Sequence, residues 1–581
     1  MCEYIKKTEN RLTADEKRQL MDIFAPKNIA VPDEDPFRSL CVTADGNIRF
    51  YGVYNKKSVF DTECDRCYIE SIDGGLTWKR HIISNKNTLG ASWQIPYSRE
   101  FIVLKGIKNS GTAAMIGNSP DDTNPRSVKV CNDTFFDFKP PFFMRSRQRI
   151  IVACCEERKE IHESAFFNVL CISDDCGRSW KTVHTDSIGL YEKHWPHKGF
   201  RWQQNTRENT IEELSDGRLM MITRTSEDYH YITYSSDGGD TWTKPERSCF
   251  HSTGTMPHLK RLSDGRILFF WCNTKPMPEL EGTDGVWEDV FTNRDANHVA
   301  ITEDDGKTWK GFRELALNPI RCNADFRSAG GPLETRDKSV HQFEALELPY
   351  GKILISYGQH SVCRRIAIFD IKWLYEKSRK EDFIYGLSAL STQAYVKSIL
   401  GGYRGTPEAP NSRVGHCAYN RTNAALLVPS PENDGREALH ICTGDDDRLV
   451  SNIGGAVWNF PASKKGRITV RTLVKGGGLR LSLLDYWMNP TDDTVEYFAD
   501  FSFVLRSDMM DGNKCYTDIV LEFDCERNIV TVTSGEYLNM SFNMQHNDHP
   551  NGLCYLHMQS ASKTKDADGS LVSEIEYNEI I

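Results

Sequence analysis

Residues 207–242 read RENTIEELSDGRLMMITRTSEDYHYITYSSDGGDTW, and this stretch decides the fold of the chain. Two apolar runs lie on either side of Ser215-Asp216-Gly217, and Asp-Gly between such runs is a strong signal for a β-hairpin. A third run, at 229–234, leads into a further turn that ends at Trp242. The stretch therefore predicts a small antiparallel sheet that ends in a distinctive turn.

The final turn of this stretch occurs four times along the chain. Its pattern is Ser/Thr-x-Asp-x-Gly-x-x-Trp, and the copies lie at 71–78, 173–180, 235–242 and 302–309. The Asp side chain can accept hydrogen bonds from backbone N–H groups of its own turn, and the Gly adopts a backbone conformation that other residues resist. The Trp is expected to fold back beneath the hairpin as an apolar plug. Four copies predict a chain built from similar blades.

These four turns resemble the Asp-box repeats of the sialidase (neuraminidase) superfamily, a family of six-bladed β-propellers. In that family the repeats lie on the outside of the blades, so they indicate a fold rather than a chemistry. The Asp residues of successive copies are separated by 102, 62 and 67 residues. Because a blade takes about 40–50 residues, the first interval predicts an additional blade without a repeat, with strands at 91–106 and 142–155. We expect about six blades between residues 30 and 390.

The predicted fold class is all-β: a six-bladed β-propeller at 31–392, a Gly/Pro-rich linker at 393–410 and a β-sandwich at 411–581. Residues 1–30 form a helical segment, in which the capping box Thr13-Ala14-Asp15-Glu16 predicts a helix within 10–24. The sandwich resembles the jelly-roll modules appended to many glycan-active enzymes. It could bind sugar, cover a propeller edge or join copies of the chain as a homo-oligomer, and these alternatives stay open.

Composition narrows the classes of partner. The net charge of −10 over 581 residues argues against a nucleic-acid binder, which usually presents a basic face. No apolar run approaches the roughly 18 residues of a membrane-spanning helix, and the N-terminal stretch lacks the apolar region of a secretory signal. The 18 cysteines are then expected as thiols in a reducing cytoplasm. We expect a carbohydrate substrate, with neither a nucleic-acid nor a membrane partner.

Two short patterns resemble metal sites. Cys64-Asp65-Arg66-Cys67 has the spacing of half a zinc site, but no second pair of Cys or His accompanies it. Asp445-Asp446-Asp447 could bind calcium, although an acidic turn is the simpler interpretation. We expect no metal and no cofactor.

The propeller prediction also places a site. In a propeller the first strand of each blade lines the central channel. A recurring phrase, an apolar strand followed by a turn, marks these first strands in the sequence. It brings four residues that are distant in sequence to one end of the channel: Arg38, Glu208, His258 and Gln342.

The family resemblance assigns roles to several residues. Sialidases hold the substrate carboxylate with three arginines, and they use a Tyr nucleophile with a Glu beside it and an Asp acid/base. By resemblance, the three arginines are Arg38, Arg224 and Arg294, the glutamate is Glu208, and the acid/base is Asp61 with Asp65 as the fallback. Guanidinium groups give bidentate bonds to a carboxylate. The alternative is that these arginines form separate structural ion pairs.

The chain departs from the family at the nucleophile. Where sialidases carry the Tyr, this chain has Gln342-Phe343-Glu344-Ala345, and a Gln cannot act as that nucleophile. Tyr357 is either a displaced nucleophile or a buried structural Tyr. Gln342 and Glu344 are then expected to bind substrate.

A loop at 193–204 is rich in groups that contact sugars, among them His197, Arg201 and Trp202. With Arg and Tyr, His258 would suit a lyase that removes a proton beside the carboxylate of a uronate. Two carboxylates, such as Glu208 with Glu344 or Asp61, would instead suit glycoside hydrolysis.

The sequence therefore predicts an exo-acting glycoside hydrolase for an oligosaccharide with an acidic terminal sugar, sialic or uronic. The alternatives are a lyase on the same architecture and a non-catalytic glycan-binding propeller.

Overall fold

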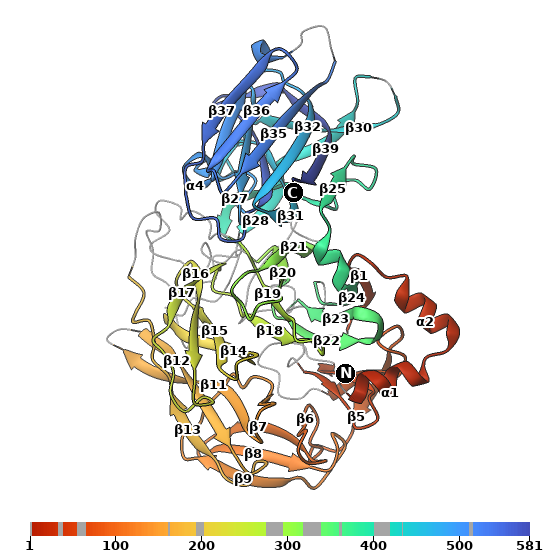
Figure 1. Ribbon diagram of the computed structural model, residues 1–581, viewed down its shortest axis with the longest axis vertical. Coiled ribbons are helices and arrows are strands. Elements are labelled where there is room, and N and C mark those ends of the chain that lie inside the picture. Colours follow the sequence, from red (N-terminus) through yellow and green to blue (C-terminus); the bar gives the residue numbers. More distant parts are fainter. Residues whose placement is uncertain are drawn as a thin grey trace. The chain divides into compact units, whose positions relative to one another are not determined.

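A computed structural model describes residues 3–32, 39–54, 65–160, 163–192, 203–274, 294–317, 339–358, 363–399, 419–432, 434–510 and 515–580. Most of these residues lie in strands, so the chain is all-β, as predicted (Figure 1). The chain divides into two compact units. The first comprises Met1–Cys272, Ile301–Lys307 and Ser328–Trp373, and the second comprises Asn273–Ala300, Thr308–Arg327 and Leu374–Ile581.

Three sheets of the propeller have four strands each, joined in sequence order. Their orders are β2-β3-β4-β5, β6-β7-β8-β9 and β18-β19-β20-β21. The strands are β2 (Leu40–Val42), β3 (Ile48–Tyr54), β4 (Asp65–Ser71), β5 (Lys79–Ile83), β6 (Trp93–Gln94), β7 (Phe101–Ile107), β8 (Gly111–Gly117), β9 (Arg126–Cys131), β18 (His258–Arg261), β19 (Ile267–Trp271), β20 (Ala296–Thr302) and β21 (Lys310–Leu317). The sheet β6–β9 contains no Asp-box, which confirms the predicted additional blade and its strands within 91–106. The strands expected at 142–155 are instead β10 and β11 of the next blade, which carries the Asp-box at 173–180.

The third and fourth blades share one eight-stranded sheet, because β12 pairs in parallel with β14 from Ala165↔Gln203 to Phe167↔Asn205. These strands are β10 (Phe142–Phe143), β11 (Ile150–Glu160), β12 (Glu163–Ser173), β13 (Lys181–His184), β14 (Gln203–Glu213), β15 (Leu219–Thr225), β16 (Tyr229–Ser235) and β17 (Glu246–His251). The hairpin β14–β15 is the one that the Asp-Gly turn at Asp216 predicts.

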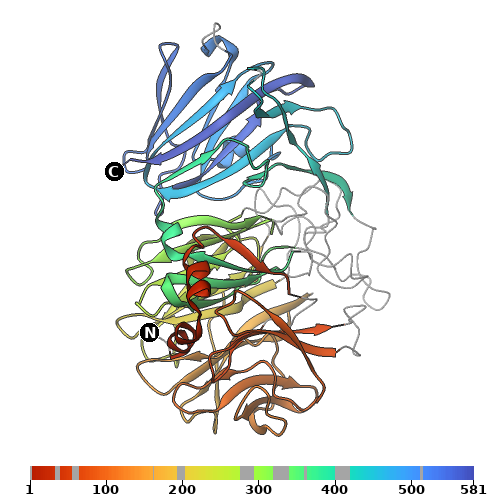
Figure 2. The same cartoon turned by 90° about the vertical axis from the view of Figure 1, so that its right-hand side faces the viewer.

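The last blade is completed by a strand from near the start of the chain. β1 (Lys27–Ala30) pairs antiparallel with β24 (Arg365–Asp370), and the sheet continues through β23 (Lys352–Tyr357) to β22 (Glu344–Leu348). Figures 1 and 2 both show this N-terminal segment beside the last blade. With this sheet the propeller has the six blades that the sequence predicts.

The N-terminal segment holds two helices where one was predicted within 10–24. They are α1 (Glu3–Arg11) and α2 (Ala14–Met21). The capping box is present, because Thr13 and Glu16 exchange the expected hydrogen bonds, and this box starts α2 and so separates it from α1. Lys352 of β23 anchors the C-terminal end of α2: its Nζ donates to the carbonyls of Met21 at 2.9 Å and Ile23 at 2.5 Å and pairs with Asp370.

The four Asp-box turns share one hydrogen-bond geometry. In each, the first hydroxyl accepts the N–H of the fixed Gly at 2.7–2.9 Å and donates to the Asp at 2.7–2.9 Å. In the first three, the Trp Nε1 donates to the carbonyl of that Gly, and the ring packs against an apolar cluster formed by its own blade and the neighbouring one. The Trp is therefore the expected plug.

In the second unit, two sheets form a β-sandwich. Their orders are β29-β30-β39-β32-β35-β36-β37, with β25 also paired to β39, and β26-β31-β38-β33-β34; β27 pairs with β28. The strands are β25 (Ser378–Glu381), β26 (Leu390–Ser391), β27 (Gln393–Ile399), β28 (Tyr419–Asn423), β29 (Ala425–Pro429), β30 (Glu437–Thr443), β31 (Gly455–Ser463), β32 (Lys465–Leu473), β33 (Leu479–Leu484), β34 (Phe501–Leu505), β35 (Thr517–Asp524), β36 (Ile529–Ser534), β37 (Leu538–Asn543), β38 (Leu553–Ser560) and β39 (Asp566–Glu579).

The core of the sandwich lies between these two sheets. Phe460 of β31 stacks on Tyr577 of β39 with ring centroids 4.6 Å apart, and both side chains are buried. Because β25 and β26 already pair with sandwich strands, the sandwich begins before the predicted boundary at 411, and β27 occupies the start of the predicted linker. The one remaining α-helix in the described residues is α4 (Val495–Phe498), and none of the described helices is long and apolar enough to cross a membrane.

Candidate functional site

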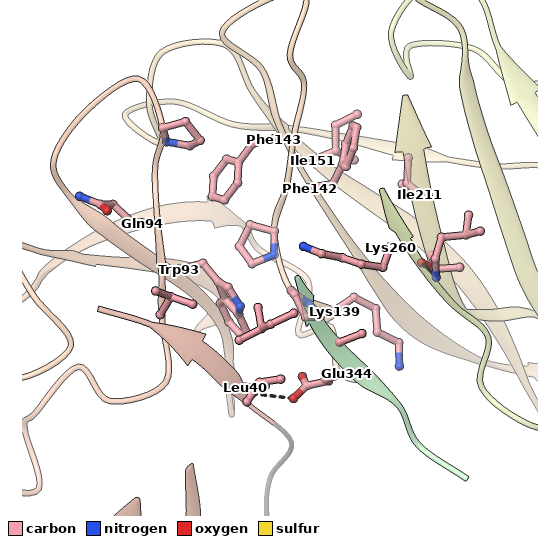
Figure 3. Close-up of a pocket in the computed structure, with 18 of the residues that line it drawn as sticks. Leu40, Trp93, Gln94, Lys139, Phe142, Phe143, Ile151, Ile211, Lys260 and Glu344 are labelled. Atoms are coloured by element: carbon pink, nitrogen blue, oxygen red, sulfur yellow. Dashed lines mark hydrogen bonds between the residues drawn. The ribbon is translucent and has the colours of Figure 1, made fainter. Parts of the chain in front are cut away.

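The first unit contains a cavity of about 1120 Å³. The first strand of each of the six blades contributes to its lining, as the propeller prediction requires. Representative lining residues are Leu40 of β2, Trp93 of β6, Phe142 of β10, Thr210 of β14, His258 of β18 and Glu344 of β22. Figure 3 shows side chains from these strands surrounding one space.

Helix α1 lies at the end of the channel where β2 and β22 finish. Lys7 Nζ donates to the carbonyl of Ala44, just after β2, at 2.8 Å, and the Tyr4 hydroxyl donates to the carbonyl of Glu347 at 2.9 Å. Both side chains also line the cavity. The predicted site lies toward the opposite end, where these strands begin.

Glu208 and Arg224, both predicted site residues, form a buried ion pair between β14 and β15. Lys139 is the second cation beside Glu208, with Nζ 3.4 Å from Oε1, and Lys139 lines the cavity. The Nζ also lies 2.8 Å from the sulfur of Met256. The guanidinium of Arg224 thus already has a carboxylate partner inside the protein.

The backbone around Glu208 is strained. Glu208 has φ 53° and Thr206 has φ 75°, in the left-handed region that residues with a Cβ avoid. The pairing of β14 with β15 shifts register on both sides of Arg207 in the same stretch. Gln342, ahead of β22, is also left-handed at φ 75°. Such conformations persist only where the surrounding structure enforces them, and they cluster at functional sites.

Two predicted residues, Glu344 and His258, line the cavity, whereas Glu208 and Arg224 do not. Glu344 Oε2 accepts the N–H of Leu40 at 2.5 Å, which ties β22 to β2. His258 Nε2 accepts the N–H of Ala345 at 3.3 Å, so that nitrogen carries no proton. Burial, with the charges of Lys260 and Lys139 acting in the same direction, lowers the pKa of His258 to about 3. His258 is therefore a neutral imidazole at physiological pH.

Most lining residues escaped the sequence prediction, among them Trp93, Lys139, Glu212 and Lys260. Burial raises the pKa of Glu212, although the N–H of Arg261 donates to its carboxylate at 3.0 Å. Strand alternation could have identified Lys260, because it lies two positions after His258 and so faces the same side. Lys139 lies in a loop ahead of β10, where no periodic pattern indicates its direction.

The remaining predicted residues lie elsewhere. Tyr357 is absent from the cavity lining; its hydroxyl donates to Asn28 at 3.0 Å, and burial raises its pKa to about 12. The two alternatives for Tyr357 were a displaced nucleophile and a buried structural Tyr, and these contacts fit the structural Tyr. Gln342 is half-buried and does not line the cavity. Arg294 is buried in the second unit, so its role in a carboxylate clamp stays a prediction.

Five predicted residues lie outside the described residues: Arg38, Asp61, His197, Arg201 and Trp202. For Asp65 the backbone opens β4, but its side chain is not described. In the described part of the chain, no group of three or more His, Cys, Asp or Glu could hold a metal ion. Asp445 and Asp446 instead pair with Lys565 at 2.7 Å and Arg448 at 2.6 Å.

Comparison with known protein families gives one match. Residues 135–360 match the family model of the BNR repeat-like domain. No curated protein matches the sequence.

Solved structures similar to this chain include three with low sequence identity. A protein of unknown function from Dyadobacter fermentans is 16% identical, with 60% of this chain and 97% of that chain covered and a TM-score of 0.40. Trypanosoma rangeli sialidase in complex with the inhibitor DANA is 13% identical, with 94% and 92% covered and a TM-score of 0.35. The same sialidase in complex with sialic acid is 13% identical, with 97% and 95% covered and a TM-score of 0.35.

Proposed function

We propose that this chain, whose propeller carries the BNR repeat-like domain of the sialidase-like superfamily, is an exo-acting glycoside hydrolase. Its substrate is an oligosaccharide with an acidic terminal sugar, sialic or uronic. The observation that carries the proposal is the channel cavity, which collects carboxyl groups, cations and aromatic rings from several blades. Sugars are bound by such mixed surfaces, because ring faces stack on aromatic side chains and hydroxyls bond to polar groups.

Two carboxyl groups of β14 suit the two roles that glycoside hydrolysis needs. Arg224 and Lys139 flank Glu208, and both cations favour its ionised form. Glu212 lines the cavity, and burial raises its pKa, which suits a group that gives a proton to the glycosidic oxygen. Glu344 lies on β22, two blades further around the ring, and is the further carboxylate available to a water or a sugar hydroxyl.

The lyase alternative has less support. It needs a His or Tyr that removes a proton from the sugar ring. Nε2 of His258 is already engaged by the N–H of Ala345, and Tyr357 does not line the cavity. The described residues therefore favour hydrolysis over elimination.

The test is turnover of an aryl sialoside, an aryl glucuronide and an aryl galacturonide. Hydrolysis of each is measured by the release of its aryl group. We expect turnover of at least one of them, and a loss of about 100-fold or more in Glu208→Gln and in Glu212→Gln. Glu522→Gln, on the sandwich, is the matched control and should retain full activity. A uronate disaccharide joined through O4 of the uronate tests the lyase: product with the ultraviolet absorbance of an unsaturated uronate would indicate elimination instead, because the sugar on O4 leaves as C5 loses its proton. Turnover that neither Glu208→Gln nor Glu212→Gln alters would refute the assignment of these two residues.

A further inference from the structure

Lys260 extends into the channel cavity from β18. Residues two apart on a strand face the same side, and His258 and Lys260 both line the cavity. Arg261 points the other way, since its guanidinium donates to the carbonyl of Glu213 at 2.9 Å. Figure 3 shows the Lys260 side chain extended into the space between the lining residues.

The ammonium group of Lys260 has no partner within the described part of the chain: neither a hydrogen bond nor an ion pair joins it to any other group there. The other two lysines of the cavity differ from it, because Lys139 pairs with Glu208 and Lys7 pairs with Glu3 at 2.9 Å. Glu212 and His258 are close enough to feel the charge of Lys260, yet neither forms an ion pair with it. An unpaired cation inside a cavity is costly unless an anion can reach it.

The wall across from β18 is aromatic. In a ring of six blades the second and fifth blades face each other, so Trp93 of β6 lies opposite Lys260. Phe142 and Phe143 of β10 extend this wall. All three rings are half-buried, and all three line the cavity. Among the described residues, the channel thus offers an apolar platform on one side and an unpaired cation on the other.

We propose that Lys260 binds the carboxylate of the acidic sugar while the ring of that sugar packs against Trp93. This inference rests on the proposed glycan site, and it makes Lys260 a determinant of specificity for acidic over neutral sugars. It also separates two roles: Arg224 holds Glu208 in place, and Lys260 supplies the charge for the ligand.

The experiment is calorimetric titration of the full chain with the methyl glycosides of glucuronic, galacturonic and N-acetylneuraminic acid. Each acid is compared with its own methyl ester, which keeps the ring and removes the charge. We expect at least one acid to bind about tenfold more tightly than its ester. Lys260→Met should abolish this preference, Lys260→Arg should keep most of it, and Lys79→Met, an exposed lysine on β5, should leave it unchanged. Thermal unfolding of each variant checks that it is folded, and Lys260→Gln serves as a second neutral variant.

Two results would overturn the inference: wild-type protein that binds no acid better than its ester, or neutral variants at position 260 that keep the wild-type preference. Binding that depends on Lys260 without turnover of any aryl glycoside would refute the hydrolase and leave the inference standing. Turnover of an acidic glycoside with an unchanged KM in Lys260→Met would support the hydrolase and refute the inference about Lys260.

Discussion

Arg224 is held by a buried carboxylate, so its loss should destabilise the propeller whatever its part in binding. Both side chains of the Arg224–Glu208 pair are less than a tenth exposed. We expect Arg224→Met to lower the free energy of unfolding by about 3 kcal/mol, because a buried charge loses one of its partners. The double variant Glu208→Gln with Arg224→Met should recover part of that loss. Arg218→Met, at a surface pair with Asp216, should change stability by less than about 1 kcal/mol. Urea unfolding compares the four proteins.

Replacing a buried acid in the sandwich, Asp500, is expected to raise stability, in contrast to replacing Arg224. Burial, together with the nearby charge of Asp485, raises the pKa of Asp500 well above its ordinary value. The folded protein then holds a proton that the unfolded chain releases, so this group lowers stability as the pH rises above about 4. We expect Asp500→Asn to raise the stability of the sandwich at pH 7 by about 1 kcal/mol or more, and to have little effect near pH 3. A pH-independent effect of the substitution would contradict this explanation.

At the scale of elements, the Asp-box turns should contribute to acid stability. Burial alone would raise the pKa of Asp237, but hydrogen bonds from Thr241, Ser235 and the N–H of Asp240 lower it well below the ordinary range. A lowered pKa adds stability above the unfolded value near about 3.9, and that stability disappears as the pH falls below it. Asp237→Ala should cost about 1 kcal/mol at pH 7 and less at pH 3. The check is the unfolding midpoint at both pH values, with exposed Asp186→Ala as the control.

At the scale of the whole propeller, Lys352 joins the N-terminal segment to the last blade. Its Nζ reaches two carbonyls of that segment and the carboxylate of Asp370. Lys352→Met should cost about 3 kcal/mol, because it leaves Asp370 buried without its cation. Hydrogen exchange should accelerate first in β1 and β24. Lys372→Met, at an exposed position next to the same blade, should leave both rates unchanged. Equal acceleration in all six blades would argue against a local anchor.

The sequence predicts more of the fold than of the candidate site. The Asp-box turns and the existence of a blade without one depend on local chemistry and spacing, so the sequence was sufficient for them. It was not sufficient for all the strands of that blade, since 142–155 belongs to the next one. The site depends on which way each strand faces, and the register shifts around Arg207 change that direction within β14. Glu212 was missed for this reason, and Lys139 was missed because it lies in a loop without a periodic pattern. Tyr357 was ambiguous because only the fold places Asn28 against its hydroxyl. The start of the sandwich was misplaced because β25 and β26 are short and pair with strands far along the chain.

The N-terminal segment can pack against the last blade only after most of the propeller has been synthesised. Ile23 meets its partner Lys352 only after 329 further positions have been translated. At the usual pace of about 5–20 residues per second, the N-terminal segment waits roughly 15 to 70 s for the blade that it completes. During that interval the apolar residues Leu20 and Ile23, buried in the finished protein, have no core to enter. On the nascent chain these two side chains therefore stay exposed to water until the last blade has been made and the ring can close.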